Sequence, residues 1–267
     1  MEKKIVFFDL DGTVSDIIDG VRPSVVEAIA RVRKAGHVPF ICTGRTRAFI
    51  PEEVLRMDFV GMVGAMGAYL EYQGQCIQNI EVTTTQARKA LDVLRAHGMI
   101  PVMEGREYMY YDKDEYTNEV DWFATVITEQ IGNRWRPIKG YENVMHINKI
   151  SAKKQPGCTA EAACTEMADF FQPVFHEGGL GGTTVEMGPT GITKGTGMKK
   201  ILELTGNTGC PVIAFGDSNN DLGMFEAADY KVAMGNATES LKKQADYITG
   251  TQEEEGILTG LEQLGLI

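Results

Sequence analysis

The first part of the chain alternates between short apolar runs and segments with helical spacing. Residues 4–8 form an almost continuous apolar run that ends at the polar side chain of Asp9. Such a run predicts a strand that is buried on both faces of a parallel sheet. Residues 23–35 then place valine and isoleucine at helical spacing, and Gly36 follows as a typical helix stop. The chain therefore opens with a strand followed by a helix.

The same alternation recurs on both sides of the middle of the chain. Apolar runs at 38–42 and 60–65 predict two further strands, joined by a helix that extends to about residue 57. The pattern resumes later with a helix from Lys194 to about 205, a strand at 211–215, a helix from Leu222 and a strand at 230–234. Strands that alternate with helices indicate right-handed crossovers and a parallel sheet. We therefore predict a doubly wound (Rossmann-like) α/β core.

The segment from about 83 to 187 has a different pattern of predicted helices and strands. Helices are predicted there at 86–97, 119–131 and 159–171, short strands at 107–111 and 145–150, and a glycine-rich turn at 178–182. This mixture is typical of an α+β module. We predict a core domain formed by residues 1–82 and 188–267, and an inserted α+β domain formed by residues 83–187.

Composition and charge narrow the possible partners. The chain has 267 residues, of which 43% are hydrophobic, and a formal net charge of -11. Binding of nucleic acid or of an anionic membrane requires a basic face, so we expect neither partner. No apolar stretch approaches the roughly 20 residues of a membrane-spanning helix, and no signal peptide is recognisable. We therefore expect a soluble cytoplasmic protein, whose oligomeric state these patterns do not predict.

The cysteines do not form a metal or redox motif. There are five, and none lies in a CxxC or an alternating Cys/His pattern. This usage is typical of a reducing cytoplasm and argues against a zinc site. Cys42 ends an apolar run, so we interpret it as a small buried hydrophobic residue rather than as a nucleophile.

Polar residues gather just after the predicted strands of the core. In an open parallel sheet, ligands bind at the carboxyl ends of the strands, where these residues would meet. The segments are Asp9-Leu10-Asp11-Gly12-Thr13, Thr43-Gly44-Arg45 and Gly216-Asp217-Ser218-Asn219-Asn220-Asp221, with Lys194-Gly195 opening a helix. Four acids, a hydroxyl group and an ammonium group are thus expected at one rim of the sheet.

The four carboxylates would repel one another and shift one another's pKa values unless a cation lay among them. The available ligands are oxygens, without thiolates or clustered histidines. Such a set favours Mg²⁺, with waters and a substrate phosphate completing the coordination. Because the chain is acidic, an anionic substrate would be attracted locally, by this cation and a few placed basic residues.

The order DxDGT, Thr-Gly-Arg, Lys-Gly and GDxxND resembles the motif series of the haloacid dehalogenase superfamily. More closely, it is similar to the Cof-type phosphatases, in which a large α/β cap (a C2 cap) is inserted between the second and third motifs. The similarity in order and size covers essentially the whole chain, whereas the specific motifs lie only in the core. It implies a phosphatase that acts on small phosphorylated metabolites, such as sugar phosphates, through an aspartyl-phosphate intermediate.

The resemblance also implies a role for each motif residue. Asp9 would be the nucleophile, and Asp11 the general acid/base that protonates the leaving oxygen and later activates water. Mg²⁺ would be bound by Asp9, Asp217 and the backbone carbonyl of Asp11, with Asp221 supporting the metal indirectly or holding Lys194. The residues implied in substrate binding are Thr43, Gly44, Arg45, Lys194 and Asn220. These roles suit phosphoryl transfer, which depends on positioning and on charge stabilisation.

One departure from the family pattern follows the third predicted strand. Relatives usually have Asn-Gly-Ala there, whereas this chain has Met66-Gly67-Ala68. The nucleophile and metal assignments do not depend on this position. A polar contact near the second motif, however, cannot be carried over from the family to this chain.

Two other functions share parts of this pattern. A phosphomutase would use the same chemistry but return the phosphoryl group to a sugar, and release of inorganic phosphate would distinguish hydrolysis from it. A receiver-like regulator would keep its phosphoaspartate and signal through a conformational change. Asp11, two residues beyond the predicted nucleophile, and the inserted domain both favour turnover over signalling.

Overall fold

The computed structural model describes residues 2–16, 19–116, 127–176 and 184–267, and the chain forms two compact units. The core unit comprises Met1–Gly44, Glu52–Gln78 and Thr193–Ile267. The inserted unit comprises Arg45–Pro51 and Asn79–Ile192. The predicted inserted domain covers residues 83–187. The observed inserted unit extends a few residues further at both ends and also includes the earlier segment Arg45–Pro51.

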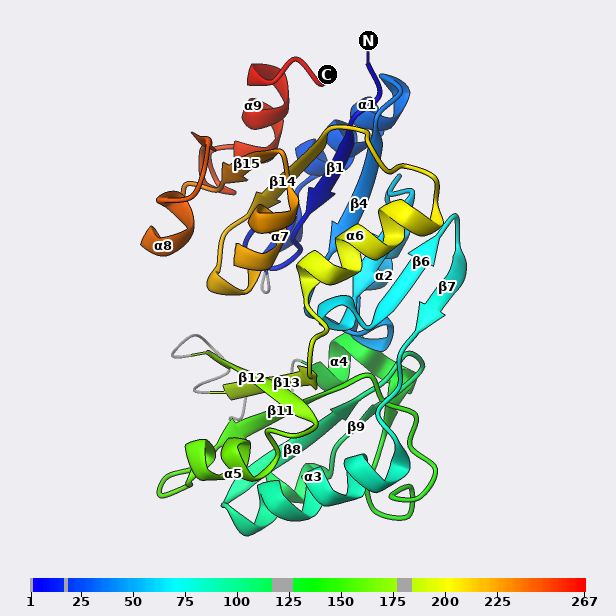
Figure 1. Cartoon of the computed structure of the whole chain (residues 1–267), viewed down its shortest axis with the longest axis vertical. Helices are drawn as coiled ribbons and strands as arrows, with labels where there is room; N and C mark the ends of the chain where they lie inside the picture. Colours follow the sequence, from blue (N-terminus) through cyan, green and yellow to red (C-terminus); the bar gives the residue numbers. More distant parts are fainter. Residues whose placement is uncertain (1, 17–18, 117–126, 177–183) are drawn as a thin grey trace. The chain divides into compact units, whose positions relative to one another are not determined.

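The core unit is built on an eight-stranded sheet in the order β16-β15-β14-β1-β4-β5-β6-β7 (Figure 1). Its parallel strands are β1 (Ile5–Phe8), β4 (Val38–Cys42), β5 (Gly61–Gly64), β14 (Val212–Gly216), β15 (Tyr230–Ala233) and β16 (Tyr247–Ile248). Strand β1 lies between β14 and β4. The predicted parallel core is therefore confirmed.

Helices cover both faces of this sheet. The helices on one face are α6 (Lys194–Leu204) and α7 (Leu222–Ala227), and those on the other are α1 (Pro23–Lys34) and α9 (Gly256–Gln263) (Figure 1). Ile5 and Phe7 of β1 join Phe40, Val63 and Met198 in one hydrophobic cluster. Because both faces are covered, the central strands are continuous apolar runs, and Asp9 is the first polar residue after β1.

Helix α6 begins at Lys194 because the residues around it form a capping box. The Thr193 side chain accepts a hydrogen bond from the Thr196 N–H (3.1 Å), and the Thr193 N–H donates to the Thr196 hydroxyl (2.9 Å). These bonds satisfy amide groups that would otherwise lack a partner at the helix start. The cap therefore fixes Lys194 as the first helical residue.

Two features of the core unit and its borders differ from the prediction. The helix expected to reach residue 57 is replaced by a 3-10 turn, η1 (Arg47–Phe49), and a single helical turn, α2 (Glu52–Leu55). Pro51 disfavours helical backbone at Ile50, which is extended. In addition, β6 (Tyr69–Tyr72) pairs antiparallel with β5, and β7 (Gln75–Asn79) follows at the sheet edge. Exposed and half-buried residues make up β7, so it lacks an apolar run.

Smaller elements complete the core unit. They are β2 (Ser15–Asp16), β3 (Gly20–Val21), η2 (Ala65–Gly67), η6 (Asn219–Asp221) and α8 (Glu239–Lys242).

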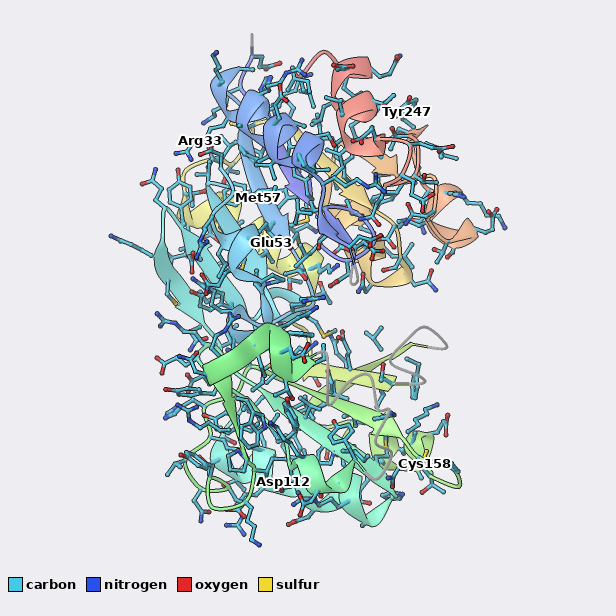
Figure 2. All side chains as sticks on the ribbon, turned by 180° about the vertical axis from the view of Figure 1, so that it is seen from behind. Arg33, Glu53, Met57, Asp112, Cys158 and Tyr247 are labelled. Carbon is cyan, nitrogen blue, oxygen red and sulfur yellow. The ribbon has the colours of Figure 1, made fainter. Side chains whose placement is uncertain are left out.

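At the surface, Arg33 Nη1 lies 3.2 Å from Asp58 Oδ1 (Figure 2 labels Arg33). Among the described helices of the whole chain, none has the length and apolar character needed to cross a bilayer.

The inserted unit contains a second, mostly antiparallel sheet in the order β10-β9-β8-β11-β13-β12. Its strands are β8 (Met99–Glu104), β9 (Met109–Tyr110), β10 (Trp135–Arg136), β11 (Lys149–Lys154), β12 (Phe171–His176) and β13 (Thr184–Pro189). Helices α3 (Thr84–Ala96) and α5 (Ala160–Glu166) cover one face (Figure 1). The short helices are η3 (Lys113–Glu115), α4 (Thr128–Ile131) and η5 (Gly132–Arg134). The predicted α+β character is confirmed.

Several element bounds in the inserted unit differ from the prediction. Helix α5 ends at Glu166, and Phe171, expected to end a helix, begins β12 instead. The strand expected at 145–150 begins only at Lys149. Most of the helix expected at 119–131, and the turn expected at 178–182, lie outside the described residues.

The sheet face opposite α3 and α5 carries a buried ionic cluster. Lys149 and Glu104 are 1% and 2% exposed. The Lys149 Nζ lies 2.7 Å from Glu186 Oε1 and 3.5 Å from Glu104 Oε1, and Ser151 donates a hydrogen bond to Glu104. Buried charges are costly unless they are paired, so a shifted pairing of β8, β11 and β13 would be disfavoured. We therefore expect the cluster to favour the observed register of these three strands.

Candidate active site

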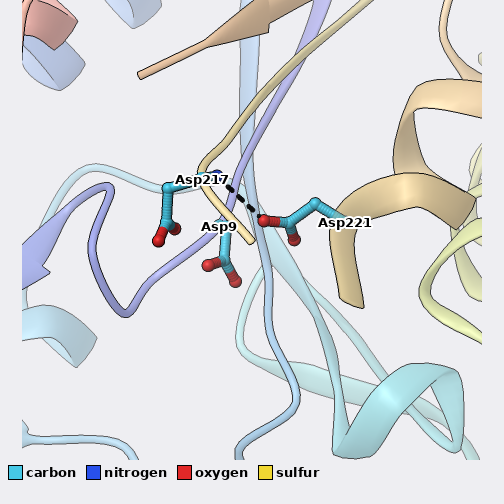
Figure 3. A group of neighbouring side chains, drawn as sticks. All are labelled: Asp9, Asp217 and Asp221. Atoms are coloured by element: carbon cyan, nitrogen blue, oxygen red, sulfur yellow. Dashed lines mark hydrogen bonds between the residues drawn. The ribbon is translucent and has the colours of Figure 1, made fainter. Parts of the chain in front are cut away.

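Three carboxylates lie together at the carboxyl ends of β1 and β14. Asp9 directly follows β1, Asp217 directly follows β14, and Asp221 ends η6. One oxygen of each lies within 4.8 Å of an oxygen of the others (Figure 3). Asp9 and Asp221 are buried and Asp217 is half-buried. The sheet brings Asp9 and Asp217 together because β1 and β14 are parallel neighbours that end at the same edge.

Lys194 places its ammonium group among these carboxylates. Its Nζ lies 2.6 Å from Asp9 Oδ1, 2.6 Å from Asp221 Oδ1 and 3.0 Å from Asn220 Oδ1. These contacts match the three protons of an ammonium group. Burial disfavours the charged amine, but Asp221 and Asp9 outweigh this effect and raise the pKa of Lys194 above its usual range. The lysine therefore stays charged.

Asp221 is committed to hydrogen bonds within the core unit. Its Oδ2 accepts from the backbone N–H groups of Asp217 and Ser218, both at 3.0 Å (Figure 3 shows the bond to Asp217). Its Oδ1 accepts from Lys194. A metal ion bound directly to Asp221 would compete with these bonds. The geometry therefore suits Asp221 as a support for Asp217 and Lys194.

Burial and the neighbouring negative charges raise the pKa values of two of the carboxyl groups. Burial, followed by the negative charge of Asp221, raises the pKa of Asp9 well above 3.8, although Lys194 opposes the shift. Burial and Asp221 also raise the pKa of Asp217 to about 7, against the hydrogen bond from Thr13. A divalent cation among these oxygens would favour their charged forms. The acidic cluster could therefore hold a hard metal ion, and its all-oxygen donor set fits Mg²⁺.

The loop after β1 is held in place by Gly12 and Thr13 of the first motif and by two residues that belong to no motif, Asn236 and Gln252. Thr13 Oγ1 donates to Asp217 Oδ1 (3.1 Å). Gly12 has a φ of +82°, and a Cβ there would lie 2.4 Å from Asp217 Oδ2, so the turn requires glycine. Asn236 Nδ2 donates to the Gly12 carbonyl (2.9 Å), and Gln252 Nε2 donates to the Thr13 carbonyl (3.2 Å). Asn236 and Gln252 lie 224 and 239 positions further along the chain, and no motif signals them.

Asp11, Thr43 and Gly44 also lie at this edge of the core sheet. Asp11 is half-buried and follows Asp9 in the loop after β1. Thr43 is buried and directly follows β4, the other neighbour of β1. The Thr43 N–H donates to the Val63 carbonyl (2.8 Å), which ties its backbone to β5. The structure thus places these residues where the sequence predicted, and their chemical roles remain predictions.

Arg45 belongs to the inserted unit, whereas Thr43 and Gly44 of the same motif belong to the core unit. It begins the segment Arg45–Pro51, which belongs to the inserted unit. Its guanidinium carbon lies 4.2 Å from the centre of the Phe49 ring, and its Nη1 donates to the Phe49 carbonyl (3.1 Å). Arg45 is 8% exposed. These contacts give the side chain a packing role within the inserted unit, and its contact with phosphate remains a prediction.

Met66 lies in a turn with left-handed backbone. Ala65, Met66 and Gly67 have φ values of 50°, 58° and 107°. Asparagine adopts this conformation more readily than methionine does. Met66 is 6% exposed, so its side chain is packed rather than solvated. The turn in this chain is therefore left-handed even though position 66 has no side-chain amide.

Cys42 is buried, and its surroundings disfavour the thiolate form. It is 0% exposed, and burial raises the pKa of its thiol well above 9.0. The thiolate, rather than the thiol, is the reactive form of cysteine. The interpretation of Cys42 as a buried hydrophobic residue is therefore supported by its surroundings.

The Cys42→Ser variant is expected to keep its phosphatase activity per folded molecule. The buried hydroxyl should lower the free energy of unfolding by about 1–3 kcal/mol if it finds no partner. Thermal unfolding and phosphate release, measured on the same sample, separate stability from catalysis. A folded but inactive variant would restore the hypothesis of a thiol nucleophile.

Comparisons with known proteins are consistent with this fold and site. Residues 6–261 match the family model of the haloacid dehalogenase-like hydrolases. The pyridoxal phosphate phosphatase YbhA of Escherichia coli (strain K12) is 27% identical, over 96% of this chain and 97% of its own length. The 5-amino-6-(5-phospho-D-ribitylamino)uracil phosphatase YwtE of Bacillus subtilis (strain 168) is 24% identical, over 98% of both proteins.

A solved structure has the same architecture. The HAD subclass IIB sugar phosphatase BT4131 superposes with a TM-score of 0.78 at 21% identity, covering 99% of this chain and 100% of its own. This similarity shows the shared fold of a parallel-sheet core with an inserted cap domain. The family match spans nearly the whole chain, and both full-length relatives described above are named phosphatases. The chain therefore belongs to the haloacid dehalogenase-like hydrolases, and it is a phosphoric monoester hydrolase of that family.

Proposed function

We propose that this protein hydrolyses small phosphate monoesters with Mg²⁺, through a covalent phosphate ester of Asp9. The observation that carries the proposal is the pairing of Asp9 with Lys194 at 2.6 Å, beside Asp217 and Asp221. A carboxylate can attack phosphorus only where the repulsion between two anions is reduced. Lys194 supplies a fixed positive charge at that place.

The reaction proceeds in two displacements at phosphorus. In the first, an Asp9 oxygen forms a bond to phosphorus while the bond to the leaving oxygen breaks, and the Asp11 carboxylic acid gives that oxygen a proton. In the second, the Asp11 carboxylate takes a proton from water, which attacks the same phosphorus. The bond between phosphorus and Asp9 then breaks, releasing inorganic phosphate and restoring both carboxyl groups.

The remaining residues bind and orient the phosphoryl group. Lys194 offsets the charge of Asp9 and of the phosphoryl oxygens. Asn220, whose Oδ1 accepts a hydrogen bond from Lys194 (3.0 Å), is proposed to position the phosphate. The Thr43 hydroxyl and the Gly44 backbone follow the strand beside β1 and are proposed to bind phosphoryl oxygens. Arg45 is proposed as a further phosphate contact. Asp221 keeps Lys194 and the backbone of Asp217 in place.

Asp9, Asp217 and the backbone carbonyl of Asp11 are proposed to hold Mg²⁺. The bound ion would supply positive charge that lowers the cost of bringing a phosphate dianion to Asp9. The raised pKa values of Asp9 and Asp217 support this assignment, because without a cation these carboxyl groups favour protonation. Asp221 is proposed to support the metal site indirectly, through its hydrogen bonds with Lys194 and with the backbone N–H of Asp217.

The substrate class is proposed from the relatives. YbhA and YwtE are named for pyridoxal phosphate and for 5-amino-6-(5-phospho-D-ribitylamino)uracil, which are both small phosphorylated metabolites. Phosphate release should therefore be measured with Mg²⁺ across a panel that contains these compounds and several sugar phosphates. Turnover of small esters is the expected result. Transfer of the phosphoryl group to a sugar, without free phosphate, would instead favour a phosphomutase.

Removing the divalent cation should abolish turnover and destabilise the protein most at high pH. The pKa of Asp217 in the folded protein, about 7, lies above its ordinary value of 3.8. Its contribution to the stability of the metal-free protein is therefore present below about pH 4 and is lost as the pH rises through about 7. Mg²⁺ favours the charged carboxylates, so it should raise the melting temperature more at about pH 8 than at about pH 5.

Thermal unfolding in chelator and in Mg²⁺, at both pH values, checks this expectation. The Asp217→Asn variant is the matched control, because its amide does not titrate and the difference between the two pH values should shrink. Full turnover in excess chelator would contradict the proposed role of the metal, as would equal stabilisation by Mg²⁺ at both pH values.

A further inference from the structure

The start of α6, which carries Lys194, is in direct backbone contact with α7 and with η2. A Cβ atom on Gly195 would lie 2.2 Å from the carbonyl oxygen of Gly223 in α7. A Cβ atom on Gly197 would lie 2.6 Å from Val63 Cγ1 and 2.8 Å from the Cα of Gly67 in η2. The Gly223 and Gly67 atoms belong to the backbone, so a change of rotamer could not relieve those two overlaps. Two glycines in the first turns of α6 therefore allow a contact that no other residue permits.

The η2 turn also requires glycine where it contacts the start of α6. Gly67 has a φ of +107°, and a Cβ there would lie 2.2 Å from the Thr193 carbonyl oxygen, next to Lys194. The Met66 N–H donates to the Thr43 carbonyl (3.2 Å), which joins this turn to the segment after β4. The helix start is thus confined between α7 and a turn that is itself bound to the segment after β4.

Stability of the helix does not explain these glycines. Glycine inside a helix weakens it, because the chain loses more conformational freedom on folding. Lys194, in contrast, needs a fixed backbone, since its ammonium group meets three acceptors at 2.6–3.0 Å. If the first turn shifts by the space of one methyl group, we expect at least one of these hydrogen bonds to lengthen beyond its normal range.

We propose that Gly195, Gly197 and Gly67 are positioning residues that fix the start of α6, so that the Lys194 ammonium group lies between Asp9 and Asp221. They touch neither substrate nor metal and act through Lys194. The inference rests on the proposed role of Lys194 in phosphoryl transfer. It adds a reason why glycine is required at these three positions.

Gly195→Ala tests the proposal, with Gly223→Ala as its matched control. The two glycines face each other, but a Cβ on Gly223 would lie 3.5 Å from the nearest atom, the Gly195 nitrogen, which is ordinary contact. Gly195→Ala is expected to lower kcat/KM by about 10- to 100-fold, because small misplacements of catalytic groups have effects of that order. Gly223→Ala should keep wild-type kcat/KM. Equal losses in the two variants would overturn the proposal.

A double-mutant cycle with Lys194→Ala shows whether Gly195 acts through the lysine. If it does, Gly195→Ala should have little further effect on kcat/KM in the Lys194→Ala background, since the group that it positions is gone. An aryl phosphate is the suitable substrate, because its good leaving group leaves measurable residual turnover. Losses that multiply across the two variants would show an independent structural role and contradict the proposal.

Acylation of the lysine amines gives a readout that does not depend on activity. Lys194 is 3% exposed, so an amine-reactive ester, followed by peptide mass spectrometry, should label it far more slowly than exposed Lys199. Gly195→Ala should speed the labelling of Lys194 relative to Lys199, and Gly223→Ala should not. Unchanged labelling in Gly195→Ala would overturn the positioning role. An inactive wild-type protein with the expected labelling pattern would instead overturn the proposed function alone.

Discussion

The Asp9→Asn variant should lose phosphatase activity by on the order of 10⁵- to 10⁶-fold, as expected for removal of an essential nucleophile. The amide is nearly the same size as the carboxylate but cannot form the anionic nucleophile. The fold should survive, because Lys194 keeps its contacts with Asp221 and Asn220. Phosphate release with Mg²⁺, together with the melting temperature, measures both effects.

Asp58→Asn is the matched control for this variant. Asp58 belongs to the same unit and also pairs with a basic residue, Arg33, but both side chains are more than half exposed. The same change of acid to amide should therefore leave turnover unchanged there. Substantial residual activity in folded Asp9→Asn would mean that water attacks phosphorus directly.

The Asp11→Asn variant should have the second largest effect, and its size should depend on the leaving group. Loss of the general acid should slow hydrolysis of alkyl phosphates by about 10²- to 10⁴-fold, because a departing alkoxide needs a proton. Aryl phosphates should be affected less, since their leaving group departs without help. With an aryl phosphate, the phosphoenzyme should also accumulate, because the same carboxylate activates water in the second step.

Metal affinity distinguishes this role of Asp11 from the alternative. The proposal assigns only the backbone carbonyl of Asp11 to Mg²⁺, so Asp11→Asn should bind the ion almost as well as wild type, as measured by titration calorimetry. Asp217→Asn should bind it much more weakly. Equal losses on alkyl and aryl phosphates, combined with weakened metal binding in Asp11→Asn, would show that the Asp11 side chain is a ligand.

The parts of the fold that position the site could be predicted because their physical signals are local. Strands β1, β4 and β14 are buried on both faces, so each is an apolar run with a polar residue at its end. Asp9, Thr43 and Asp217 follow those runs directly, and the parallel topology then brings the three strand ends to one edge.

Other features depend on distant contacts and left no local signal. Asn236 and Gln252 hold the loop after β1 through single hydrogen bonds to its carbonyl groups. In the sequence these two residues look like any other polar surface residues, so nothing local indicates their role. Strand β7 is exposed at a sheet edge and has no apolar run. Arg45–Pro51 belongs to the inserted unit by its packing, although it follows a core motif in the sequence. Phe171 lies in β12 because it pairs with Pro189, far along the chain.

The most direct test of the covalent mechanism is to identify the residue that carries the phosphoryl group during turnover. An aryl phosphate is mixed with the Mg²⁺-loaded Asp11→Asn variant, the reaction is quenched in acid, and the protein is treated with borohydride before peptide mass spectrometry. Borohydride reduces an acyl phosphate to the alcohol, so the covalent mechanism predicts homoserine at position 9 and an unchanged Asp217. Turnover with no reduced residue, or reduction at a residue other than Asp9, would contradict the covalent mechanism.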